Sequence, residues 1–333
     1  MLRYSVIVPA WNAEDSLSLC LRALEQQTLP KEQYEIIVVD DGSSDRTREV
    51  ACRFTIQYHF QDNAGPATAR NQGVDLAKGE LVLFTDADCV PDPDWLEAMT
   101  VPFSNPEVAA VKGAYRTDQK GIVARFSQLE FEERFDMLRK KESIDMVDTY
   151  SAAFRKDIFQ KLAGFDTSFP EPNNEDTEFS YRMAEHGYRM IFAPDAVVRH
   201  LNHPDAVVRY FRLEFSRGFW RMMVYRMFPG KMMADSYTPQ SLKAQIIALL
   251  LIETSLLLFF IDPLFAGTLL FFGIVIFFLF SLSFVRMVWK KDRYVAVLSP
   301  LFLALRAGAI GSGALWGLLR ICCGYVLKEK RDG

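Results

Sequence analysis

Short apolar runs alternate with helical stretches over the first part of the chain. The helical stretches include one with Leu17, Leu21 and Leu24 at helical spacing, which Asn12 is expected to cap, and one over Ala67–Lys78. The alternation predicts an α/β fold with a parallel sheet covered by helices, and ligands of such sheets bind at the carboxyl ends of the strands. The predicted strands are Tyr4–Val8 (ended by Pro9), Ile36–Val39, Thr55–Phe60 and Leu81–Phe84.

Pairs of aspartates follow two of these strands. Asp40 and Asp41 follow the second strand, and we expect one of them to face the ligand crevice. Asp86 and Asp88 follow Leu81–Phe84, and like charges on one face repel unless a cation or an internal partner lies between them. Their oxygens suit Mg²⁺ or Mn²⁺, with phosphate oxygens completing the shell. The alternative is an acidic turn that only caps the helix near Trp95.

Charge and cysteine content exclude several classes of protein. The net charge of −4 gives no indication of nucleic-acid binding. The five cysteines are scattered without metal-ligand spacing, so neither a disulfide framework nor a zinc site is predicted. The first residues lack the long apolar run of a signal peptide, and we therefore expect the first domain in the cytoplasm.

The last third of the chain is strongly apolar. Helices at about 244–261 and 264–285 are long enough to cross a bilayer, and the basic loop 286–293 after them predicts a hairpin that returns to the cytoplasmic side. The segment at about 295–324 contains Arg306 and several glycines, so we expect a broken, re-entrant or interfacial segment there, although it is long enough to span. Glu253 is the expected partner of Arg306.

Two further stretches combine charges with aromatic residues at helical spacing. Ile122–Lys141 does so moderately, and Val207–Met227 does so strongly, with five arginines. This composition is typical of helices in the anionic headgroup layer and could also bind a lipid phosphate. Packing of the aromatic side chains against the first domain is the competing interpretation.

Several motifs, in this order and at these intervals, resemble glycosyltransferase family 2, whose enzymes have a GT-A fold. They are VIVPAWNAEDSLSLCLRAL, VVDDGSSDRT, NAGPATARNQG, FTDADCVPDPDWL, GAYRTDQK and NNEDTEFSYRMAEHGYRM, and the match covers about residues 3–220. The resemblance implies transfer of a sugar from a nucleotide donor with inversion. By position, Pro9 and Asp41 would hold the base and ribose, Arg70 would lie near the base and diphosphate, and Asp86 and Asp88 would form the metal and donor motif.

The resemblance also implies where the proton of the acceptor is taken. Glu175 and Asp176 match the family's acidic pair, so Asp176 is the expected base and Glu175 its helper or an acceptor contact. The alternative is an acidic first turn that the helix dipole favours and that has no catalytic role. His200 is expected as a further metal or diphosphate ligand, or else as a loop histidine bonded to a carbonyl.

Together these observations predict a catalytic domain over 1–204, a basic and aromatic linker over 205–240 and a membrane domain over 241–333. The expected donor is a UDP- or GDP-linked sugar, and the expected acceptor is a polyprenyl-linked saccharide in the inner or plasma membrane. LEFSRGFWR departs from the pattern of processive synthases, which favours single additions. Direct transfer to polyprenyl phosphate, or an inactive nucleotide-sugar-binding scaffold, are the alternatives.

Overall fold

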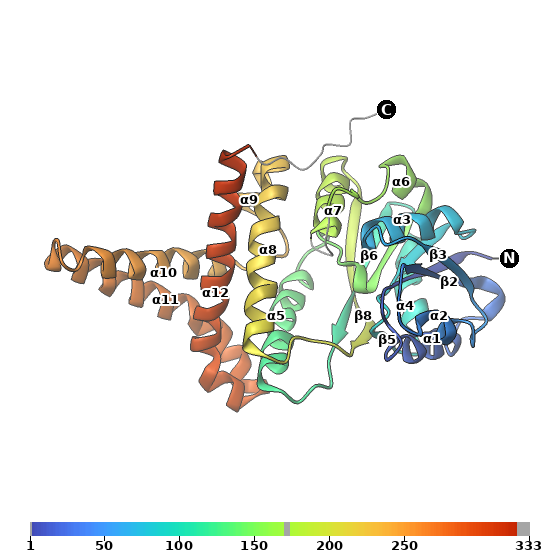
Figure 1. Cartoon of the computed structure of the whole chain (residues 1–333), viewed down its shortest axis with the longest axis horizontal. Helices are drawn as coiled ribbons and strands as arrows, with labels where there is room; N and C mark the ends of the chain where they lie inside the picture. Colours follow the sequence, from blue (N-terminus) through green and yellow to red (C-terminus); the bar gives the residue numbers. More distant parts are fainter. Residues whose placement is uncertain (1, 170–173, 325–333) are drawn as a thin grey trace. The chain divides into compact units, whose positions relative to one another are not determined.

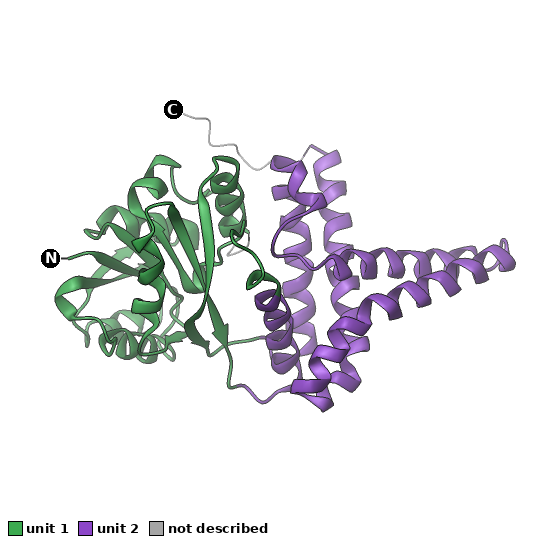
Figure 2. Cartoon of the chain, turned by 180° about the vertical axis from the view of Figure 1, so that it is seen from behind, with its two compact units in different colours: residues 1–118, 137–203, 327–333 green, residues 119–136, 204–326 purple. Residues whose placement is uncertain are grey.

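The computed structural model describes residues 2–169 and 174–324, which form two compact units (Figures 1 and 2). Of the described residues, the first unit comprises those up to 118 and 137–203, and the second comprises 119–136 and 204–324. Residues 119–136 therefore interrupt the first unit in the sequence. Each unit has its own architecture.

An eight-stranded sheet forms the centre of the first unit, in the order β3-β2-β1-β4-β7-β6-β8-β5. The strands β3, β2, β1 and β4 are parallel, whereas β7 is antiparallel to both β4 and β6. This mixed sheet with flanking helices confirms the predicted α/β class. The strands are β1 Tyr4–Ala10, β2 Tyr34–Asp41, β3 Gln57–Gln61, β4 Leu81–Phe84, β5 Cys89–Pro91, β6 Val108–Arg116, β7 Ala152–Arg155 and β8 Arg189–His200.

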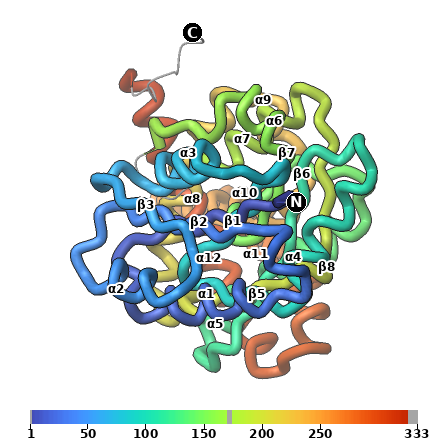
Figure 3. The backbone as a smooth tube through the Cα atoms, turned by 90° about the vertical axis from the view of Figure 1, so that its right-hand side faces the viewer, coloured from blue at the N-terminus to red at the C-terminus, as the bar shows by residue number. Residues whose placement is uncertain are grey.

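Helices cover both faces of the parallel strands. Figure 3 shows α3 on one side of β1 and β2, with α1 and α2 on the other. On β4, Phe84 packs against Phe154 of β7 and Phe159 of α6. The ring centroid of Phe159 in turn lies 4.8 Å from that of Phe179 of α7. This buried aromatic cluster fixes α7 against the sheet. The helices are α1 Leu17–Glu25, α2 Thr47–Ala51, α3 Pro66–Leu76, α4 Trp95–Thr100, α6 Lys156–Lys161 and α7 Glu175–Glu185.

The first strand and the turn after it differ from the prediction. Pro9 does not end β1, which continues to Ala10 beside β2. The pairing of β1 with β4 stops at Ile7, so the missing N–H of Pro9 removes no hydrogen bond to β4. Asn12 does not cap a helix, since α1 begins only at Leu17. Instead, Asn12 adopts φ 46° and its Oδ1 accepts a hydrogen bond from the Ser44 amide at 2.9 Å. It ties the end of β1 to the loop after β2.

The second unit is helical. Three of its helices, α10, α11 and α12, are long and apolar enough to cross a membrane. The carboxylate of Asp262 caps α11 by accepting from the Phe265 amide at 3.0 Å, and the Asp292 carboxylate caps α12 by accepting from the Val295 amide at 3.2 Å. The helices are α5 Ile122–Leu138, α8 Val207–Met227, α9 Pro229–Met233, α10 Gln240–Leu258, α11 Pro263–Lys291 and α12 Arg293–Cys322.

The expected break in the third apolar segment does not occur. α12 is one continuous helix of 30 residues, even though it contains Pro300 and several glycines. The glycines serve packing instead: a Cβ on Gly313 would lie 2.1 Å from the carbonyl oxygen of Phe215, and one on Gly218 would lie 2.3 Å from that of Ile310. Glycine therefore lets the backbones of α8 and α12 approach each other closely.

The expected pairing of Arg306 with Glu253 is wrong. Arg306, which is 1% exposed, donates to Glu130 Oε1 of α5 at 2.9 Å and to Gln245 Oε1 of α10 at 3.0 Å, whereas Glu253 is exposed. The Tyr210 hydroxyl donates to the other oxygen of Glu130 at 2.8 Å. A buried charge needs a partner and hydrogen bonds, and this network supplies both.

Candidate active site

The carboxyl ends of β1 and β2 lie side by side, with Pro9 paired to Val39. Asp41 ends β2 and is 4% exposed. Its carboxylate accepts hydrogen bonds from the amides of Ala64 at 2.8 Å and Gly65 at 2.9 Å, so it shapes the turn that leads into α3. The preceding Asp40 accepts from the Ser43 amide at 2.9 Å and the Tyr58 hydroxyl at 2.7 Å.

Neither aspartate is therefore left over to face a crevice, contrary to the expectation for this pair. Gly42 explains how the chain leaves β2 so abruptly. It has φ 75°, and a Cβ there would lie 2.7 Å from the Asn63 amide nitrogen. Asp41 and Gly42 together fix the loop that begins α3.

Arg70 of α3 joins two acidic residues that are distant in sequence. One nitrogen of its guanidinium donates to Asp86 Oδ1 at 2.9 Å and another donates to Glu175 Oε1 at 2.7 Å. Burial alone would lower the pKa of Arg70, but Asp86 and Glu175 outweigh it and raise the pKa, so the residue is a permanent cation. The structure thus connects the loop after β4 to the start of α7.

The acidic pair Glu175 and Asp176 opens α7, and Asn174 before it has a left-handed φ of 67°. From the sequence, Asn173, Asn174 or Asp176 could begin this helix, and Asn173 lies outside the described residues. Glu175 is 3% exposed, and its Oε2 has no hydrogen-bond partner among the described residues. Burial, followed by the nearby Asp176 charge, raises the pKa of Glu175 to about 7, and Arg70 opposes this rise.

Asp176 differs from its neighbour because it is only partly buried. Its Oδ1 accepts a hydrogen bond from the Thr177 amide at 2.6 Å. The two carboxylates therefore have separate environments: one is locked to Arg70 inside the protein and the other lies at the helix end with partial access to solvent.

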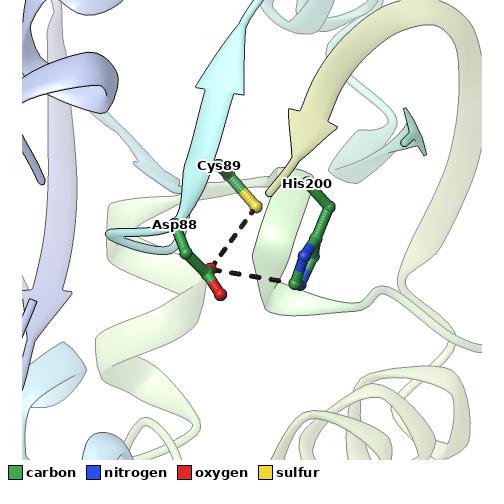
Figure 4. Close-up of side chains that lie close together, drawn as sticks. All are labelled: Asp88, Cys89 and His200. Atoms are coloured by element: carbon green, nitrogen blue, oxygen red, sulfur yellow. Dashed lines mark hydrogen bonds and ion pairs between the residues drawn. The ribbon is translucent and has the colours of Figure 1, made fainter. Parts of the chain in front are cut away.

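Asp88, Cys89 and His200 form the one cluster of possible metal ligands found among the described residues (Figure 4). The antiparallel pairing of β5 and β8 places Cys89 opposite His200. His200 Nε2 and Cys89 Sγ each lie 4.0 Å from Asp88 Oδ1. Asp86 is not part of this cluster, because its carboxylate is bound by Arg70.

The donor types in this cluster fit a divalent cation. A carboxylate oxygen with an imidazole nitrogen suits Mn²⁺. Burial and the charges of Asp86 and Asp88 raise the pKa of the Cys89 thiol, which disfavours its thiolate. His200 Nδ1 accepts a hydrogen bond from the Asn202 amide at 3.2 Å, whereas the alternative interpretation expected the ring to donate to a carbonyl. To bind a cation through Nε2, the ring must give up this hydrogen bond, because only one ring nitrogen of a neutral imidazole is an acceptor.

Two residues beside the cluster were not identified from the sequence. The Tyr115 ring lies 5.6 Å from the His200 ring and 4.6 Å from the Tyr150 ring. The buried Lys112 pairs with Asp148 and donates to the Tyr150 hydroxyl at 3.0 Å. A lysine within the otherwise apolar run VAAVKGAY was the available signal, since a buried cation requires partners.

Comparison with known proteins finds similarity to glycosyltransferases. The family model described as "Glycosyl transferase family 2" matches residues 5–163. Glycosyltransferase AglE of Haloferax volcanii is 31% identical over 214 residues, which are 60% of this chain and 67% of that protein. The probable glycosyltransferase YdaM of Bacillus subtilis is 32% identical over 211 residues, 59% of this chain and 50% of that protein. The chain thus spans about two thirds of the first relative and half of the second.

A solved structure extends the similarity over nearly the whole chain. The mannosyltransferase PcManGT of Pyrobaculum calidifontis, in complex with GDP-Man and Mn²⁺, superposes with a TM-score of 0.61 at 20% identity, covering 95% of this chain and 87% of that one. At this identity the similarity shows the fold alone, and it confirms the predicted GT-A architecture. With the sequence relatives, it shows that the chain belongs to glycosyltransferase family 2.

Proposed function

We propose that the chain transfers a sugar, with inversion, from a UDP- or GDP-linked donor to a lipid-borne saccharide. The observation that carries this proposal is the Arg70 bridge, which gathers the acidic pair of α7 and the aspartate loop after β4 into one site. The donor class is supported by solved neighbours: PcManGT was solved with GDP-Man and Mn²⁺, and GalNAc-T7 (TM-score 0.50, 15% identity, covering 72% of this chain and 52% of that one) with UDP, GalNAc and Mn²⁺.

In this proposal the donor occupies the carboxyl ends of the parallel strands, where ligands of such sheets bind. Pro9 contacts the base, and Asp41 acts through the turn that it holds in place. Asp86 and Arg70 position the ribose and diphosphate side of the donor. A Mn²⁺ or Mg²⁺ ion held by Asp88 and His200 would offset the negative charge that develops on the leaving diphosphate.

Inversion requires a base on the far side of the sugar from the leaving group. We assign this role to Asp176, because its carboxylate is partly exposed while that of Glu175 is buried and bound to Arg70. Glu175 then acts as a positioning residue. By holding Arg70, it fixes the start of α7 relative to the aspartate loop.

The apolar helices of the second unit support membrane association, and we propose that the α10–α11 hairpin crosses the inner or plasma membrane with the catalytic residues on the cytoplasmic side. Nucleotide sugars would then meet an acceptor whose headgroup lies at the same face. Transfer directly onto polyprenyl phosphate is the alternative acceptor chemistry, and an inactive nucleotide-sugar-binding scaffold is the non-enzymatic one.

Membranes containing the chain, incubated with a radiolabelled nucleotide sugar and Mn²⁺, test this function. We expect label in the organic-solvent extract, and we expect Asp176→Asn to abolish it. Mild acid releases the label from the lipid in both cases, and the size of the released sugar distinguishes the two acceptors: a labelled monosaccharide indicates transfer onto polyprenyl phosphate, and a labelled oligosaccharide indicates transfer onto a lipid-borne saccharide. Label confined to the aqueous phase with every donor, or equal labelling by the Asp176 variant, would contradict the proposal.

A further inference from the structure

The helix α12 passes every test of length and composition for a membrane span, yet its neighbours are unlike those of a span. Within the second unit, α12 packs along α8, with Gly313 against Phe215 and Gly317 against Phe219, where a Cβ would lie 2.9 Å from the carbonyl oxygen. The same stretch of α8 carries Arg217 and is flanked by four more arginines of that helix. The middle of α12 therefore lies directly against a strongly basic helix.

The other half of α12 is lined by charged residues of α5. The Arg125 guanidinium pairs with Asp292 at the start of α12, and Glu130 pairs with Arg306. Lys291, at the end of α11, pairs with Glu132 of α5. From its first residue to Gly317, α12 is thus accompanied by charged residues, several of which have exposed side chains.

A spanning α12 would carry α5 and α8 into the hydrocarbon with it, and exposed arginines such as Arg209 and Arg212 would have to follow. Charged side chains at membrane depth are costly and occur facing a bundle interior, not exposed. The α10–α11 hairpin carries few charges: Glu253 of α10 is exposed, whereas α11 is uncharged from Pro263 to Val285 and its outward side chains are large and apolar.

The direction of the α10–α11 hairpin relative to α8 and α12 also bears on whether α12 spans the membrane. Figures 1 and 2 show α8 and α12 side by side, with the α10–α11 hairpin running away at a steep angle to both. If the hairpin follows the membrane normal, α8 and α12 lie close to the membrane plane.

The outward face of α12 carries exposed large apolar side chains toward both of its ends. Exposed apolar side chains recur at one side of the helix, a stripe that we call the α12 stripe. A spanning helix at the edge of a bundle would also have such a stripe, so the charged neighbours and the hairpin direction decide between the two arrangements. The α12 stripe consists of Tyr294, Val297, Leu298, Leu301, Leu315, Trp316 and Leu319, which are 42% to 81% exposed.

We infer that α12 is not a third membrane span but lies with α8 in the plane of the bilayer surface. The partner of this surface is a lipid bilayer with anionic headgroups: the α12 stripe enters the acyl boundary, and the arginines of α8 remain at the level of the phosphates. The hairpin α10–α11 is then the sole part of the described chain that crosses the hydrocarbon. Both ends of α12 lie on one side of the membrane.

Spin-label depth measurements test this arrangement in the full chain. Exposed Cys52, Cys322 and Cys323 are replaced by serine, the protein is reconstituted in phosphatidylcholine vesicles containing phosphatidylglycerol, and depth is obtained from relaxation by oxygen and by a water-soluble nickel chelate. Single labels are placed on exposed positions of the α12 stripe and, as matched controls, on exposed positions of α11. The labelled positions are Val297, Leu301, Leu315 and Leu319 on α12, and Phe265, Phe272 and Phe280 on α11.

We expect the four α12 labels to report one shallow depth, while the α11 labels pass through a deep maximum. A depth on α12 that rises and falls from one end to the other would overturn the inference.

A second measurement needs little change to the chain. In sealed vesicles, an impermeant maleimide should reach the native Cys322 and Cys323 from the same side as a cysteine at Tyr294, and should reach a cysteine at Pro263 from the opposite side. Access to positions 294 and 322 from opposite sides would establish a span.

Discussion

Glu175→Gln removes the one buried carboxyl of the site whose pKa is raised into the neutral range. Burial and Asp176 move the pKa of Glu175 from an ordinary value of 4.5 to about 7. Between these two values the folded protein keeps a proton that the unfolded chain has released, so the folded state loses stability as the pH rises through this window. At about 1.4 kcal/mol per pKa unit, the loss is about 3 kcal/mol by pH 8.

For a unit of this size, a change of about 3 kcal/mol corresponds to roughly 6–12 °C in Tm. The assay is the Tm of the detergent-solubilised chain by intrinsic fluorescence at pH values from 5 to 8.5. The useful quantity is the difference between wild type and Glu175→Gln at each pH, because other titrating groups cancel in it. We expect wild type to lose stability relative to the variant as the pH rises.

Glu185→Gln is the matched control, since Glu185 lies on the same helix and is exposed. Its Tm should follow that of wild type at every pH. Parallel curves for wild type and Glu175→Gln would contradict a raised pKa at Glu175, because they would mean that Arg70 keeps this residue ionised throughout the range.

Three other substitutions test the rest of the site and the second unit. Asp88→Ala should remove Mn²⁺-dependent donor turnover together with Mn²⁺ binding measured by electron paramagnetic resonance, and unchanged binding would exclude Asp88 as a ligand. Asp176→Asn should lower transfer by about 10² to 10⁴ while donor affinity by calorimetry is kept; a loss of affinity with normal turnover of bound donor would place Asp176 in the donor site. Gly313→Val should lower Tm by an amount equivalent to about 1–3 kcal/mol or more because its side chain meets the Phe215 backbone, whereas Gly308→Ala, which meets only a leucine methyl at 3.9 Å, should not.

The sequence predicts what depends on local pattern. The apolar runs before Asp41 and Asp86 are strands as expected, because a short buried strand ending in acidic residues has few alternative structures. Length and hydropathy also predict the long apolar helices after residue 240. Family membership followed from several motifs in a fixed order and is confirmed.

What the sequence did not predict is pairing over long separations. Arg70 and Glu175 are 105 residues apart, and Arg306 and Glu130 are 176 apart, so no local pattern connects them. Glu253 was preferred for Arg306 only because it is the acidic residue in the neighbouring apolar segment. The cap predicted at Asn12 failed for a similar reason: its side chain bonds to a loop more than 30 residues away.

Metal-dependent glycosyl transfer is tested most directly by the release of nucleoside diphosphate by the purified chain from a panel of nucleotide sugars, with and without Mn²⁺ or Mg²⁺ and with lipid extract as acceptor. We expect release from one donor class that depends on the metal, is stimulated by lipid, and is lost in both Asp88→Ala and Asp176→Asn. Release that persists in excess chelator and in both variants, or no release from any donor while nucleotide sugars still bind, would contradict metal-dependent transfer.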